Sequence, residues 1–173
     1  MKRGLNISGQ FYLISAIIIS AIVISIVAIS NYSKKTNYND VDSLKGELKI
    51  ESAKVIDYAI NNQQSQTQIY QLLISFTQNY IDSKASYKSL YFVFGNQTNI
   101  TLKGFQNNPH NVSFGNNLVT QSSGAFFNSI IPSNTRVNLS IDSNSHVFNL
   151  KSGKNFYFVI SKEIGGENYV VEG

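Results

Sequence analysis

Few residues in this sequence have side chains that commonly do acid–base or metal chemistry. The chain has two histidines, His110 and His146, and no cysteine. The lack of cysteine excludes disulfides, thiolate metal sites and cysteine nucleophiles. Both histidines fall at the edges of expected strands or turns, without a patterned carboxylate beside them. We therefore expect no catalytic role, no metal site and no cofactor.

Other motifs point away from an enzyme as well. The stretch from Asp142 to His146 (DSNSH) resembles the start of a calcium loop, but lacks the glycine and the terminal glutamate that such a loop needs. A polar hairpin turn explains it better. There is no G-x-S-x-G motif and no glycine-rich phosphate loop. Glu163 and Glu167 flank a Gly-Gly turn, so a glycosidase-like acid pair stays open but has no specific support.

Four N-x-[ST] motifs are candidate N-glycosylation sites, with acceptors at Asn96, Asn99, Asn111 and Asn138. In a chain so rich in Asn, Ser and Thr, a few such motifs also arise by chance. Glycosylation and chance are both left open at this point.

The composition narrows the class of protein. Only 14% of the residues are charged, and the net charge of +4 is scattered along the chain. No basic run is present that could follow a phosphate backbone, so we expect no nucleic-acid partner. Uncharged Ser, Asn, Gln and Thr supply most of the polar surface, which disfavours a cytosolic housekeeping enzyme.

One apolar segment stands out near the N-terminus. Residues 11–29 (FYLISAIIISAIVISIVAI) contain no charge, glycine or proline. At about 1.5 Å per residue, a helix of this length covers roughly 28 Å, close to the hydrocarbon thickness of a bilayer. This predicts a transmembrane helix over residues 10–32. Lys2 and Arg3 precede it, which places the N-terminus in the cytoplasm and the rest outside.

Small residues recur four apart in this segment. Ala16 with Ser20, and Ala21 with Ser25, form two small-x-x-x-small pairs. Such pairs let a second helix approach closely, so we expect these four residues to serve helix packing.

The start of the chain has a recognisable order: a short basic leader (MKRGLNISG), then Gly9-Gln10-Phe11, then the apolar segment. This order resembles the class III signal peptide of archaeal type IV pilin-like proteins. The resemblance implies that a prepilin-type peptidase cuts between Gly9 and Gln10, removes the leader 1–9 and leaves the apolar helix in place. It also implies assembly with copies of the chain or related pilins.

Two positions depart from that family's pattern. Ser8 stands where the family prefers a basic residue two positions before the cut. Ile14 stands where many members carry a glutamate that is thought to pair with a neighbour's terminal amine. A second candidate cut after Gly4 has Arg3 well placed, but it leaves polar residues in what should be apolar mature sequence.

The rest of the chain reads as an α+β head over residues 40–173. Residues 33–39 are polar and predict a linker. Helical periodicity over residues 40–82 predicts one or two amphipathic helices, with a Gln-rich interruption at 61–68 that fits either a linker or a bend. Strand-like segments follow, separated by turn formers, and predict an antiparallel sheet packed on the helices. These segments are 90–94, 99–105, 112–114, 136–141, 146–150, 156–164 and 167–172.

Two functional hypotheses follow. The leading one is a structural subunit of a type IV pilus-like surface filament, which assembles through the N-terminal apolar helix and displays the head outside the cell. The alternative is an uncleaved, membrane-anchored extracytoplasmic adhesin or a component of an export machine. Both place the protein at the cell membrane and cell surface.

Overall fold

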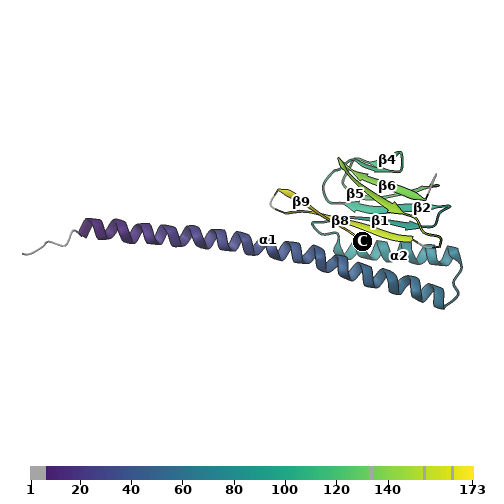
Figure 1. Cartoon of the computed structure of the whole chain (residues 1–173), viewed down its shortest axis with the longest axis horizontal. Coiled ribbons are helices and arrows are strands. Elements are labelled where there is room, and N and C mark those ends of the chain that lie inside the picture. Colours follow the sequence, from purple (N-terminus) through teal and green to yellow (C-terminus); the bar gives the residue numbers. More distant parts are fainter. Residues whose placement is uncertain (1–6, 133–134, 154, 165) are drawn as a thin grey trace, which may run out of the picture. The chain divides into compact units, whose positions relative to one another are not determined.

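The computed structural model describes residues 7–132, 135–153, 155–164 and 166–173 (Figure 1). Within residues 7–39 it describes side chains only at Tyr12 and at residues 14–28. Contacts within the chain divide it into two units, Met1–Asn39 and Asp40–Gly173. The second unit, called the head below, contains both hydrophobic cores.

The first helix, α1, comprises Ile7–Asn61 and contributes to both units. It continues through residues 33–39, where the sequence had predicted a linker. Those residues are polar, but they include no proline or glycine that would stop a helix. Polarity without a helix breaker is therefore compatible with one continuous helix.

The expectation of a transmembrane helix over residues 10–32 is wrong. In the part of the chain that the structure describes, no helix combines the length and the hydropathy that crossing a membrane requires. The apolar residues are the first part of a 55-residue helix and do not form an element of their own. Residues 1–6 of the expected leader lie outside the described residues.

The head begins with the last part of α1 and a second helix, α2, over Gln66–Lys84. A capping box starts α2: Ser65 Oγ accepts the Gln68 N–H at 3.3 Å, and Gln68 Oε1 accepts the Ser65 N–H at 2.8 Å. The Gln-rich stretch therefore contains the end of one helix and the start of the next. The buried apolar residues of α1 in the head are Val41, Leu44, Leu48 and Ala59.

Antiparallel strands make up the remainder of the described head. Their bounds are β1 Ser89–Gly95, β2 Ile100–Gln106, β3 Val112–Phe114, β4 Asn117–Thr120, β5 Gly124–Ile130, β6 Arg136–Ile141, β7 Asn144–Asn149, β8 Asn155–Ile164 and β9 Glu167–Glu172. The α+β class and the antiparallel pairing are confirmed. The last two strands, β8 and β9, pair antiparallel with each other.

The strands form two sheets, whereas one sheet was expected. One sheet has the order β5-β2-β1-β8-β9 and the other has the order β4-β3-β6-β7. The central strand β1 explains why a second sheet is needed, because all seven of its residues are buried. A strand that is apolar on both faces needs cover on both faces, and the two helices can cover only one.

The head therefore has three layers, with helices, the five-stranded sheet and the four-stranded sheet in that order (Figure 1). Alternate residues of β1 enter different cores because successive side chains of a strand point to opposite faces. Phe92 and Phe94 pack with the helices. Tyr91 and Val93 pack with Phe114 and other residues of the four-stranded sheet.

Candidate functional site

The first unit presents a continuous apolar surface along the described part of α1. Its large side chains lie all around the helix, and each is more than half exposed: Ile14, Ile17, Ile18, Ile19, Ile22, Val23, Ile24, Ile26 and Val27. A helix that is hydrophobic all round is ordinarily covered by other apolar groups. This surface, called the apolar helix surface below, is the first candidate site.

Two of the serines on this surface use their hydroxyl hydrogens within the helix. Ser20 Oγ donates to the carbonyl oxygen of Ala16 at 2.8 Å, and Ser25 Oγ donates to that of Ala21 at 2.8 Å. Each hydroxyl hydrogen is thereby used within the helix itself. The two pairs predicted from the sequence leave four small side chains where a neighbouring backbone can come close.

The predicted processing site falls in the same helix. Gly9 and Gln10 belong to α1 by their backbone, and their side chains lie outside the described residues. The prediction of a cut between them therefore stays a prediction.

The four candidate glycosylation asparagines differ in accessibility. Asn99 and Asn111 have exposed side chains. Asn96 is half-buried, and its Nδ2, the atom that a glycan would modify, donates to Gln66 Oε1 at 3.1 Å. Asn138 is also half-buried and accepts a hydrogen bond from Ser145 Oγ at 2.6 Å. Accessibility thus favours Asn99 and Asn111 as glycan acceptors.

Both histidines pair with carboxylates that the sequence pattern did not reveal. His110 Nδ1 lies 2.6 Å from Asp142 Oδ2, and His146 Nδ1 lies 2.9 Å from Glu172 Oε2. No sequence pattern indicated these carboxylates, because folding brings together residues that are far apart in the chain. No group of three or more metal-ligating side chains occurs among the described residues.

Asp142 has a structural role at the β6–β7 turn. Its Oδ1 accepts the Asn111 N–H at 2.8 Å, and its backbone has a φ of 51°. The hydrogen bonds from Asn111 and His110 outweigh burial and hold the pKa of Asp142 below its ordinary value of 3.8. The stretch that resembles a calcium loop is therefore a turn whose carboxylate binds other groups of the same protein.

Substituting Asp142→Asn should make stability less sensitive to acid. A carboxyl whose pKa is lowered by folding stabilises the protein above its unfolded pKa, and that stabilisation is lost as pH falls through the folded pKa. We expect the variant to lose about 1 kcal/mol at pH 7, after allowance for solvent screening, and less at pH 3. Asparagine tolerates the positive φ, so the comparison isolates the charge. Urea unfolding at pH 7, 5 and 3 measures it.

The exposed Asp57 of α1 provides the control for this series. Asp57→Asn changes the same charge without removing the turn contacts. If the free energy of unfolding depends on pH in the same way in both variants, Asp142 has no special role in stability toward acid.

A carboxylate and two lysines connect α1 to the five-stranded sheet within the head. Asp40 Oδ2 lies 2.8 Å from Lys88 Nζ and 3.2 Å from Lys162 Nζ. The lysine side chains are only 10% and 13% exposed, whereas that of Asp40 is 47% exposed. Burial raises the pKa of Asp40, but the hydrogen bonds and charges of the two lysines outweigh it and hold the pKa below 3.8. Asp40 is therefore the anion that neutralises two nearly buried cations.

Comparison with protein-family models, curated proteins and solved structures found no match to this chain. The resemblance to pilin-like proteins therefore has no support from these comparisons. Function has to be argued from the surfaces of the chain itself.

Proposed function

We propose that this protein is a structural subunit of a pilus-like surface filament, assembled through the apolar helix surface with the head displayed outside the cell. The observation that carries the proposal is the exposure of isoleucines and valines all around one helix segment, with the Ser20 and Ser25 hydroxyls bonded to their own backbone. Large exposed apolar patches on soluble proteins mark interaction surfaces.

A second copy of the same segment is the occupant that best fits this surface. The segment carries no charge between residues 11 and 29, so it offers no ion-pair partner to a charged surface. The small pairs Ala16–Ser20 and Ala21–Ser25 give depressions beside bulky isoleucines, so that copies can interdigitate. A bundle of such helices would cover every apolar face at once.

The N-terminal residues support the same proposal. The leader resembles that of type IV pilin-like proteins, and a cut between Gly9 and Gln10 would remove Lys2 and Arg3. Without these charges the helix end can enter an apolar bundle at lower cost, because burying an unpaired cation is expensive. Ile14, where many pilins carry glutamate, means that any terminal amine has to find another partner.

The assembly surface is tested by the double substitution Ala16→Leu with Ser20→Leu. We expect assembly to weaken by about tenfold or more, because overpacking costs about 1–3 kcal/mol per contact. Sedimentation and negative-stain electron microscopy of the protein isolated from its own cells measure filament yield.

The matched control is Ile19→Leu with Val23→Leu, which has the same spacing on the helix but adds almost no bulk. Wild-type filament yield from the Ala16/Ser20 variant would refute the packing role. If the unaltered protein forms no filaments, the proposal fails and an adhesin or export component that does not assemble replaces it. N-terminal sequencing of the same material shows whether Gln10 is the first residue.

A further inference from the structure

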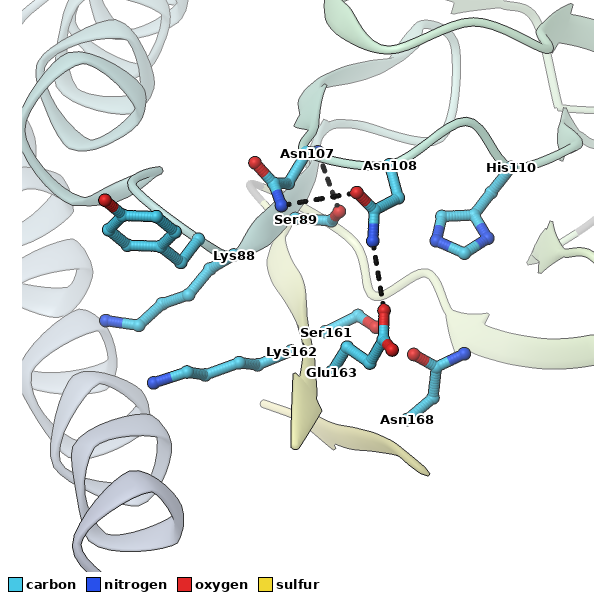
Figure 2. A pocket seen from close by; sticks show the side chains of 10 residues that line it. Lys88, Ser89, Asn107, Asn108, His110, Ser161, Lys162, Glu163 and Asn168 are labelled. Atoms are coloured by element: carbon cyan, nitrogen blue, oxygen red, sulfur yellow. Dashed lines mark hydrogen bonds between the residues drawn. The ribbon is translucent and has the colours of Figure 1, made fainter. Parts of the chain in front are cut away.

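A polar recess of about 240 Å³ lies at one end of the five-stranded sheet of the head. It is lined by the residues just before and at the start of β1, by the segment after β2, and by residues of β8 and β9 (Figure 2). The residues that matter here are Tyr87, Asn107, Asn108, Glu163 and Asn168. We propose that this recess binds a single ring of a neutral saccharide. The proposal does not depend on filament assembly.

Tyr87 is the first observation in favour of a ligand. It is 80% exposed, the most exposed tyrosine among the described side chains, and its backbone has a φ of 62°. A bulky residue in the left-handed region is a conformational outlier that costs free energy, and such outliers cluster at binding sites. Tyr87 thus presents an aromatic ring to solvent and is also one of the residues that line the recess. The C–H face of a pyranose ring is an apolar surface that an aromatic ring can cover.

A connected row of amides and a carboxylate provides the polar half of the site. Asn107 Nδ2 donates to Asn108 Oδ1 at 3.5 Å, and Asn108 Nδ2 donates to Glu163 Oε2 at 3.2 Å (Figure 2). An amide has two N–H donors and two carbonyl lone pairs, so the bonds made here leave capacity on Asn108 and Glu163. A sugar hydroxyl both donates and accepts, and this mixed row of donors and acceptors matches it.

The charged residues that line the recess disfavour an anionic ligand. Lys88 and Lys162 line the recess, but both bind Asp40, and their ammonium ends point toward the helices and away from Glu163 (Figure 2). Glu163 brings a negative charge to the opposite side of the recess. His110 also lines the recess, and its ring pairs with a different carboxylate. An acidic sugar or phosphate would therefore be repelled by Glu163 while the basic residues of the recess already have carboxylate partners, whereas a neutral sugar would meet no such repulsion.

The size of the recess limits the ligand to about one ring. Sites for drug-sized molecules occupy about 300–1,000 Å³, and this recess is smaller. Ser89 and Ser161 also line the recess and are only 4% and 8% exposed, so they belong to its buried side.

Saturation-transfer-difference NMR on the full-length protein tests the proposal. The probes are the methyl glycosides of glucose, galactose, mannose and N-acetylglucosamine, with glucuronic acid as the acidic comparison. The detergent must have no sugar head group. We expect saturation transfer to at least one neutral probe and none to glucuronic acid.

Two substitutions locate the binding. Tyr87→Gly removes the ring and relieves the strained φ, so we expect binding to weaken by about tenfold or more while the thermal midpoint does not fall. Asn108→Ala should also weaken binding. Tyr58→Ala removes an exposed tyrosine from α1 of the head and should change nothing.

Three results would overturn the proposal: no transfer to any neutral probe, stronger transfer to glucuronic acid, or neutral binding that both recess variants retain.

Discussion

Replacing Asp40 with asparagine is expected to lower the free energy of unfolding by about 1–3 kcal/mol. The amide can still accept a hydrogen bond, but it cannot neutralise Lys88 and Lys162, whose side chains are nearly buried. Breaking a fully buried pair costs more, and the partial exposure of Asp40 reduces the effect. Urea unfolding of the full-length protein, followed by circular dichroism, measures the change.

Two further variants make this prediction specific. Asp42 lies two residues away and accepts a hydrogen bond from the Tyr169 hydroxyl at 3.2 Å. Asp42→Asn keeps an acceptor there, so we expect a loss below about 0.5 kcal/mol. Adding Lys88→Met and Lys162→Met to Asp40→Asn should restore much of the stability, because the two nearly buried cations are then gone. Equal losses in the two asparagine variants would show that charge neutralisation at Asp40 is unimportant.

The Asp40 contacts could not be read from the sequence. Asp40 and Lys162 are separated by 122 positions, and only the pairing of β1 with β8 brings Lys88 and Lys162 to the same edge of the sheet. In the sequence alone, Asp40 looks like an ordinary acidic residue near the start of a helix, and Lys88 and Lys162 look like ordinary lysines near the ends of strands. The recess could not be predicted from the sequence either. Asn108 and Glu163 look like turn residues there, and only folding brings them together.

Local patterns did predict most elements of the head. Strand-like apolar segments separated by turn formers located seven strands, and helical periodicity over residues 40–82 located the helices of the head. Two strands were missed. β4 has four residues, none of which is buried, and β5 begins with glycine and presents exposed phenylalanine beside polar residues. Neither carries the apolar alternation that marks a half-buried strand.

The second sheet was also missed, although the sequence held a signal for it. Residues 90–94 (LYFVF) are apolar at every position, as expected for a strand covered on both faces. A single sheet packed on helices would have left Tyr91 and Val93 in solvent. In the structure Tyr91 is fully buried.

If the second sheet completes the core, removing a side chain between the sheets should be as harmful as removing one beneath the helices. Phe114 of β3 is fully buried and belongs to the cluster that contains Tyr91 and Val93. We expect Phe114→Ala to lower the free energy of unfolding by about 3–5 kcal/mol, from lost burial and from the cavity left behind. Urea unfolding, followed by circular dichroism, measures it.

Phe127 of β5 provides the matched control because its side chain is 54% exposed. Phe127→Ala removes the same atoms from a largely solvated position, so the expected loss is below about 1 kcal/mol. A small loss for Phe114→Ala, similar to that of Phe127→Ala, would mean that the four-stranded sheet packs only loosely on its neighbour. A large loss of unfolding free energy for Phe114→Ala alone would show that the core between the sheets stabilises the protein to an extent similar to the core beneath the helices. Both faces of β1 would then depend on full burial.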